Sequence, residues 1–268
     1  MPPQKVVIVT GASSGIGRAT AEYLAHRGHR VFGTARSPER VPDIPGAQLL
    51  PLDITQTASV TDTVRTVLNS AGRIDVLVNN AGAALMGAFE ENSIEQAQAL
   101  FDVNVFGVIR TSQAVLPAMR AQGSGLMVNV SSVLGFLPGP YFALYTSTKH
   151  ALEGLSESLD HEVRQFGIRV VLVEPPFTRT GLGAHSVSAA ALLREYDSER
   201  SRAAAAIAAS IETGPPPVTV AEEIGRAIEG PYRLRRPVAG QAKLLSRLRR
   251  IMPAGLVDRQ LRRAFGLV

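Results

Sequence analysis

The chain has 268 residues, 45% of them hydrophobic, which is enough to bury one large globular core. It contains no cysteine, so disulfides and thiolate metal sites are excluded, and a reducing compartment is compatible with the sequence. The net charge of +5 is localised: residues 233–263 hold ten Lys or Arg and one acid, whereas the remainder carries 18 basic and 22 acidic residues. We therefore expect no nucleic-acid partner, and only the basic tail bears on membranes.

Short β-branched runs alternate with longer segments of helical period, which is typical of stacked βαβ units. Helices are predicted at residues 15–28 and 55–72, among others. The strand runs are apolar nearly throughout, which indicates a mostly parallel sheet covered by helices on both faces. The predicted strands are residues 5–10, 29–35, 47–53, 74–79, 125–131 and 168–174, with a weaker seventh at 232–238. We expect one α/β domain over residues 1–268.

No targeting or membrane-spanning segment is predicted near the start of the chain. The apolar run "VVIV" is far shorter than the hydrophobic region of a signal peptide and leads directly into glycines. We therefore expect a cytoplasmic protein.

One region interrupts the alternation after the sixth strand. Within residues 181–216, glycine and proline bracket an alanine-rich helical segment. An excursion at the carboxyl end of a sheet strand is well placed to cover a ligand crevice, so we predict a helical substrate lid. A plain pair of surface helices is the alternative.

The stretch "TGASSGIG", residues 10–17, follows the first predicted strand and begins the first helix. This context suggests phosphate binding, because glycine lets the backbone turn tightly and the free N–H groups of a helix start attract an anion. The spacing of Gly11, Gly15 and Gly17 is G-x-x-x-G-x-G. Glycine spacing alone also fits an ordinary β-turn-α connection.

The residue after the second strand bears on the choice of cofactor. Many dinucleotide-binding folds place an acid there to accept hydrogen bonds from the ribose 2′-OH, but this chain has Arg36 and no carboxylate before Glu39. A guanidinium can pair with a 2′-phosphate, which an acid would repel. The sequence favours NADP(H), with NAD(H) as the second choice; a solvated charge is the alternative for Arg36.

Between about residue 5 and residue 180 the chain contains, in order, "TGASSGIG", "LDIT", "NNAG", "NVFG", "VSSVLG", "YTSTK" and "EPPFTRT". This ordered series resembles the classical short-chain dehydrogenase/reductase family. The stretch "GFLPGPYFALY" and the predicted lid are similar to the hydroxysteroid and retinol dehydrogenase branch. The resemblance implies a single-domain Rossmann-type, doubly wound fold and a nicotinamide cofactor. We also expect a homodimer or homotetramer.

Carried over residue by residue, the resemblance implies a cofactor site. It places Gly11, Ser13, Ser14, Gly15, Ile16 and Gly17 around the phosphates, Asp53 and Ile54 at the adenine, Asn80, Ala81 and Gly82 beside the ribose, and Pro175, Thr178 and Thr180 near the nicotinamide. A turn or helix-start cap is the alternative for Asp53. The family usually has Pro-Gly where this chain has Pro175-Pro176, and a second proline lacks an N–H and stiffens the loop.

The resemblance also implies a catalytic group of Asn104, Ser132, Tyr145 and Lys149. Tyr145 and Lys149 are at i and i+4, so they share one face of a helix that begins near residue 144. A nearby cation lowers the pKa of a phenol, which would let Tyr145 act as a general acid or base. Lys149 would also hold the nicotinamide ribose, Ser132 would hydrogen-bond the carbonyl oxygen, and Asn104 would link Lys149 through water to solvent. We expect no metal, because the five histidines lack ligand spacing.

The expected substrate is a small apolar molecule with a carbonyl or alcohol group. The stretch before the tyrosine offers Phe136, Leu137, Tyr141, Phe142 and Leu144 as apolar contacts, although these residues can equally serve packing. A catalytically idle, nucleotide-sensing or scaffold protein on the same fold is the main alternative. Against it, all four catalytic positions hold reactive residue types.

The basic tail, residues 240–268, has Leu244, Leu245, Leu248 and Ile251 at helical spacing among arginines. One interpretation is an amphipathic helix that lies on an anionic membrane. The favoured interpretation is that the apolar face packs on the domain or on a sister subunit while the arginines are solvated.

Overall fold

A parallel sheet forms the centre of the computed structural model, which describes residues 3–180, 187–248 and 253–267. The strand order is β3-β2-β1-β4-β6-β7-β9, and every neighbouring pair is parallel. The strands are β1 (Val6–Val9), β2 (Arg30–Ala35), β3 (Ala47–Pro51), β4 (Val76–Asn79), β6 (Gly125–Val130), β7 (Ile168–Glu174) and β9 (Arg235–Pro237). The predicted seven-stranded α/β fold is confirmed, including the weak last strand.

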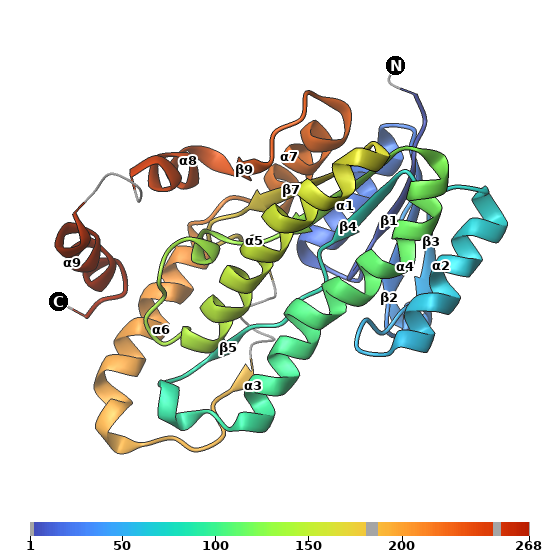
Figure 1. Ribbon diagram of the computed structural model, residues 1–268. Coiled ribbons are helices and arrows are strands. Elements are labelled where there is room, and N and C mark those ends of the chain that lie inside the picture. Colours follow the sequence, from blue (N-terminus) through green and yellow to red (C-terminus); the bar gives the residue numbers. More distant parts are fainter. Residues whose placement is uncertain (1–2, 181–186, 249–252, 268) are drawn as a thin grey trace.

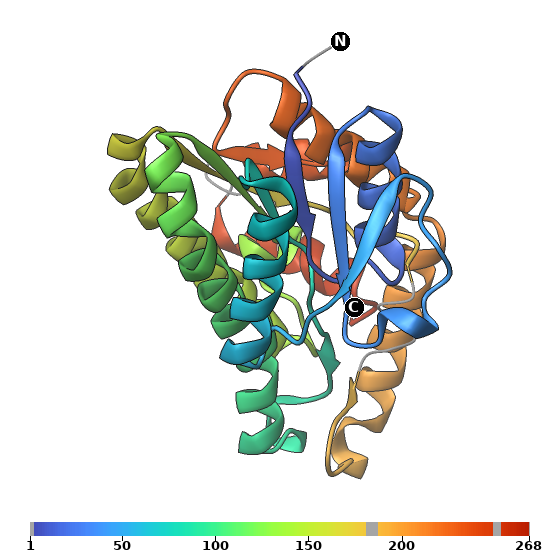
Figure 2. The same ribbon diagram turned by 90° about the vertical axis from the view of Figure 1, so that its right-hand side faces the viewer.

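Helices cover both faces of the sheet (Figures 1 and 2). One face packs on α1 (Gly15–His26) and α7 (Pro217–Glu229), and the other on α2 (Thr57–Ala71), α4 (Gly107–Gln122) and α5 (Ala143–Val163). Along β1, Val7 and Val9 join the first core and Val6 and Ile8 the second. This alternation explains the continuous apolar runs, because each strand buries both of its faces.

The excursion after β7 contains the predicted helical segment. It includes β8 (Val187–Ser188), which pairs with β5 (Leu85–Met86), and then α6 (Asp197–Glu212). Residues 181–186 of the predicted lid lie outside the described part of the chain. The buried carboxylate of Glu91 anchors this excursion, because it accepts hydrogen bonds from the N–H of Leu193 and from Arg200 on α6; its role as a substrate lid stays a prediction.

The chain between β5 and β6 contains a break in regular α-helical geometry. Helix α3 (Ile94–Phe101) leads into a π-helical turn, Asp102–Phe106, before α4 begins. A π-helical turn shifts the phase of the helix around it and often marks a functional site. Asn104 lies within this turn.

The tail forms α8 (Ala239–Leu248) and α9 (Ala254–Ala264). Leu244 and Leu245 of the predicted apolar face are 57% and 39% exposed, so these two side chains do not pack on the domain of this chain, and packing on a sister subunit stays a prediction. Phe265 and Leu267, by contrast, are buried. Ile251 and the side chain of Leu248 lie outside the described residues. No helix in the described ranges is both long and apolar enough to cross a membrane.

Candidate active site

The carboxyl ends of the parallel strands gather the predicted site residues at one edge of the sheet. Gly11 follows β1, Arg36 follows β2, Asn80 follows β4 and Ser132 follows β6. In open α/β sheets this edge is where ligands bind, next to the point at which the strand order reverses. Here the reversal lies between β1 and β4, beside the glycine loop.

The glycine loop has a shape that only glycine allows. Gly11 and Gly15 have φ of +68° and +55°, in the left-handed region. A Cβ on Gly17 would lie 2.1 Å from the carbonyl oxygen of Gly11, so the loop and the start of α1 pack backbone to backbone. Ser13 and Ser14 are exposed there, and Ile16 is partly buried. Exposed hydroxyls and a free helix start fit a bound phosphate.

Hydrogen bonds from the end of β4 fix this loop. The side-chain amide of Asn80 donates to the carbonyls of Thr10 and Gly11, at 2.9 and 3.2 Å. The hydroxyl of Thr10 accepts from the N–H groups of Asn80 and Ala81, each at 3.0 Å. Asn80 therefore fixes the position of the glycine loop, a structural role that the motif alone did not reveal.

Two charged residues mark the far end of the predicted cofactor site. Arg36 is exposed immediately beyond β2. Asp53 accepts hydrogen bonds from the N–H and hydroxyl of Thr55, at 2.9 and 2.7 Å, and these bonds hold the pKa of Asp53 below its usual range, with Arg36 contributing. Asp53 therefore stabilises a turn, and its contact with the adenine stays a prediction. Ile54 is buried against Gly107.

Two carbonyls of the loop after β7 accept hydrogen bonds from neighbouring residues. The carbonyl of Pro175 accepts from the N–H of Val133 at 2.9 Å, and that of Pro176 accepts from the hydroxyl of Thr178 at 2.9 Å. Thr180 faces the glycine loop, since a Cβ on Gly15 would lie 3.4 Å from its side chain. The loop therefore reaches the start of α1 despite the second proline.

Ser132, Tyr145 and Lys149 converge as the spacing predicts. Helix α5 begins at Ala143, and Tyr145 and Lys149 lie on its buried face. Tyr145 shares a hydrogen bond with Ser132. The Lys149 ammonium donates to the carbonyl of Val130 at 2.9 Å and lies 5.7 Å from the centroid of the Tyr145 ring.

The predicted fall in the tyrosine pKa is wrong for this state of the protein. Burial raises the pKa of Tyr145 to about 12, and the hydrogen bond with Ser132 only partly opposes it. Burial also lowers the pKa of Lys149 to about 8, against the opposing effect of Glu153. Desolvation dominates because Tyr145 belongs to a buried apolar cluster.

Asn104 is held by neighbours on two segments. Its Oδ1 accepts from the N–H of Ala83 at 2.8 Å, and its amide donates to the carbonyl of Ala83 at 2.9 Å and to the hydroxyl of Thr148 at 3.1 Å. Gly82 lies beside it, since a Cβ there would be 3.3 Å from Oδ1. The amide is thus fixed next to the residue that precedes Lys149.

The sequence did not reveal a partly buried ionic cluster that begins one helical turn after Lys149. Arg235 on β9 contacts Glu153 and Glu157 on α5 and Glu174 at the end of β7. Burial and the neighbouring Glu153 raise the pKa of Glu174 to about 7. The signal that was available is the i, i+4 series Tyr145, Lys149, Glu153 and Glu157, which continues the catalytic face along α5.

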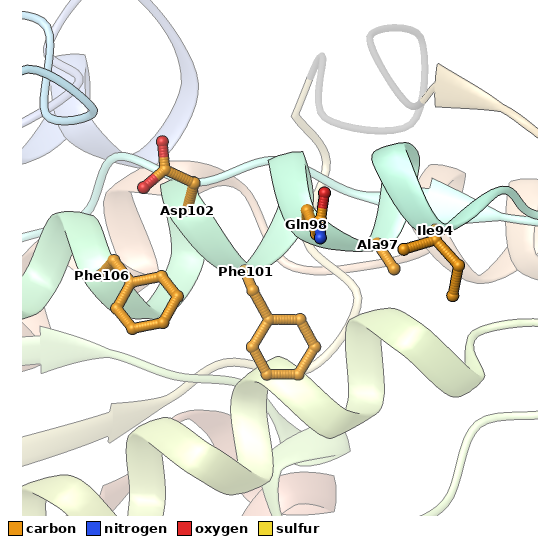
Figure 3. Close-up of a pocket in the computed structure, with 6 residues that line it drawn as sticks. All are labelled: Ile94, Ala97, Gln98, Phe101, Asp102 and Phe106. Carbon is orange, nitrogen blue, oxygen red and sulfur yellow. The ribbon is translucent and has the colours of Figure 1, made fainter.

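Two other features of the described chain lie apart from these residues. A surface depression along α3 and the π-helical turn is lined by Ile94, Ala97, Gln98, Phe101, Asp102 and Phe106 (Figure 3), none of which is a predicted site residue. Within the described ranges, no three His, Cys, Asp or Glu side chains are grouped to hold a metal ion.

Comparison with known proteins agrees with this geometry. Residues 5–191 match the family described as short chain dehydrogenase. A 3-ketodihydrosphingosine reductase from Bacteroides thetaiotaomicron is 41% identical over 181 residues, which are 68% of this chain and 66% of that protein. The match therefore spans slightly less than two thirds of that relative.

Solved structures resemble the chain over almost its whole length. A short-chain dehydrogenase from Streptomyces avermitilis has a TM-score of 0.83 and 37% identity, and the match covers 96% of this chain and 93% of that one. A relative from Burkholderia phymatum in complex with NAD gives 0.80 and 26%, with 96% and 95% covered. A metagenomic oxidoreductase in complex with NADP gives 0.69 and 28%, with 88% and 98% covered. This chain belongs to the short-chain dehydrogenase family of nicotinamide-dependent oxidoreductases.

Proposed function

We propose that this chain is an NADP(H)-dependent oxidoreductase that interconverts a ketone or aldehyde and the alcohol on an apolar small molecule. The observation that carries the proposal is the position of the Tyr145 phenol. It is hydrogen-bonded to Ser132, and the centroid of its ring lies 5.7 Å from the ammonium of Lys149. This group lies at the carboxyl edge of the sheet, where the glycine loop also lies. No observation favours a catalytically idle protein.

Residues already described would hold the cofactor. The loop of Gly11, Gly15 and Gly17 would bind the phosphates, Asn80 to Gly82 would lie beside the ribose, and Arg36 would pair with a 2′-phosphate. The bound nicotinamide supplies or accepts the hydride. The preference for NADP(H) is supported by Arg36, and among solved relatives both NAD and NADP occur.

The chain's own residues would move the proton. Tyr145 donates its proton to the carbonyl oxygen during reduction, and the resulting phenolate is stabilised by the ammonium of Lys149. The Ser132 hydroxyl stabilises charge on the carbonyl oxygen as that charge develops. Because the pKa of Tyr145 is about 12, the phenol holds its proton near neutrality and starts the cycle as an acid.

An apolar substrate is supported by the cluster around the phenol. Phe142, Leu137 and Leu134 belong to the same buried cluster as Tyr145, and Phe136 and Tyr141 pack against this cluster. The related protein from Bacteroides thetaiotaomicron is named a 3-ketodihydrosphingosine reductase, and the reduction of a keto group agrees with the proposed chemistry.

The test is NADPH oxidation with a panel of ketones and aldehydes, in wild type and Tyr145→Phe. We expect turnover to fall about 10² to 10⁴-fold in the variant while NADPH binding is kept, because only the proton-donating hydroxyl is removed. Tyr23→Phe, on α1, serves as the matched control. Undiminished turnover in Tyr145→Phe would refute the mechanism, and tight NADPH binding by wild type without turnover of any compound would favour a sensor.

Self-association and location complete the proposal. A homodimer or homotetramer is supported by apolar side chains beside the α3 depression, where Ile94 and Phe106 are 70% and 51% exposed. Light scattering on wild type and Phe106→Glu tests this self-association, and a monomeric wild type would contradict it.

The cytoplasmic location stays a prediction that cell fractionation can check.

A further inference from the structure

The last described residues of the chain lie in the apolar surroundings of Tyr145. Phe265 and Leu267 are 4% and 8% exposed, and both belong to the cluster that contains the phenol. The same cluster contains Phe142 at the start of α5 and Ile207 on the lid helix α6. The tail, the lid and the catalytic helix therefore share one apolar core.

A series of three ring contacts leads from the phenol of Tyr145 to the tail. The ring centroids of Tyr145 and Phe142 are 5.7 Å apart, those of Phe142 and Phe177 are 6.5 Å apart, and those of Phe177 and Phe265 are 6.4 Å apart. Separations of this size are typical of favourable ring contacts. Phe177 lies in the loop after β7, so the path crosses from the tail to α5 through the segment that begins the lid.

The backbone at the end of α9 directs these two side chains inward. The N–H of Gly266 donates to the carbonyl of Arg263 at 3.0 Å, and the N–H of Leu267 donates to that of Arg262 at 2.8 Å. With a φ of +67° at Gly266, this is a Schellman turn, which reverses the chain at a helix end. A Cβ on Gly266 would lie 3.4 Å from the carbonyl oxygen of Arg202, so the turn lies against α6.

We propose that residues 253–267 form a strap over the substrate side of Tyr145, and that Phe265 and Leu267 determine specificity by contacting the apolar part of the substrate. The inference rests on the function proposed above. Ser132 and Lys149 occupy the polar side of the phenol, so a carbonyl bound there extends its remaining atoms into the apolar cluster. The strap closes that cluster from outside, which selects ketones or alcohols with an extended or bulky apolar substituent.

The test uses the full-length variants Phe265→Ala and Leu267→Ala, with Arg259→Ala as the control, because Arg259 is exposed on the same helix. The measured quantity is kcat/KM with NADPH for methyl ketones from acetone to 2-undecanone. We expect Phe265→Ala and Leu267→Ala each to change the ratio between the longest and shortest ketones at least about tenfold, mainly through KM, because even one methylene in an apolar pocket changes discrimination by that factor. An unchanged ratio, or an equal loss for every ketone, would overturn the assignment.

A second measurement does not depend on turnover. Hydrogen–deuterium exchange is followed over residues 133–145 and 203–207 in wild type, Phe265→Ala and Arg259→Ala. Faster exchange in Phe265→Ala alone supports the strap, and identical exchange in all three refutes it. If wild type binds NADPH but reduces no ketone, the proposed function fails, and exchange still decides whether the strap covers Tyr145.

Discussion

Glu153 lies one helical turn beyond Lys149 on α5, and its negative charge opposes the loss of charge that burial imposes on the lysine. Arg235 contacts the same carboxylate from β9 and also contacts Glu174 at the end of β7. The proton on Lys149 is therefore coupled to an ionic cluster that joins α5 to two strands of the sheet.

The variant Glu153→Gln should lower the pKa of Lys149 further below about 8, because it removes the charge that favours the ammonium. Activity that needs the ammonium falls as pH rises through this pKa, so the fall should begin about one pH unit lower in the variant. The measurement is kcat/KM between pH 6 and 10. Glu157→Gln, which removes another partner of Arg235, is the control; a matching displacement there would rule out a specific effect of Glu153.

The exposed guanidinium of Arg36 should decide between the two nicotinamide cofactors. Arg36→Glu is expected to raise KM for NADPH more than tenfold relative to NADH, because a carboxylate repels the 2′-phosphate and can accept from the 2′-OH. Steady-state kinetics with both cofactors measure this. Arg40→Glu introduces the same charge change four residues further on, at a side chain 84% exposed. Equal effects in both variants would point to net charge alone.

Stability should fall between about pH 4.5 and pH 7 through Glu174. Its pKa is raised by burial to about 7 in the folded protein, against an unfolded value of 4.5, so the folded state binds more protons in this window. The contribution is fully present below pH 4.5 and is lost as pH rises through 7. Glu174→Gln should flatten this part of the Tm curve, whereas Glu157→Gln should keep it. A wild-type Tm that rises across the window would contradict the assignment.

The carboxylate of Asp160 should contribute strongly to the free energy of unfolding above about pH 3.8, which is the ordinary pKa of an aspartate. Although burial acts in the opposite direction, hydrogen bonds from Arg169, Arg164 and the N–H of Val170 hold its pKa well below the usual range. Asp160→Asn should cost about 2–3 kcal/mol in the free energy of unfolding at pH 7, measured in urea. The loss should shrink as pH falls below 3.8, because wild type then gives up the same ion pairs. The control is Asp62→Asn, whose partner Arg65 is exposed; a similar loss there would remove the argument.

The sheet was predictable because each central strand buries both faces and therefore reads as an unbroken apolar run. The run "IRVVLVE" became β7 over the same seven residues, whereas 232–238 shortened to Arg235–Pro237. The pair of β5 and β8 was not predictable, since two residues carry no periodic signal.

Parts of the site depend on tertiary neighbours and escaped the sequence for that reason. The spacing showed that Lys149 lies near Tyr145, but not that a buried apolar cluster drawn from distant segments would desolvate the phenol and reverse the direction of its pKa shift. Likewise, Glu153 and Glu174 meet Arg235 only because β9 pairs with β7.

The π-helical turn Asp102–Phe106 changes the direction in which side chains point around the helix axis, and two sets of contacts depend on that direction. Helix α4 must point Val115 and Met119 at the sheet, while Asn104 must point its amide at Ala83 and Thr148. Each helical residue rotates the chain by about 100°, so deletion of a single residue from this turn would keep either the contacts of α4 with the sheet or those of Asn104, but not both. The number of residues in this turn is thus as constrained as their identity.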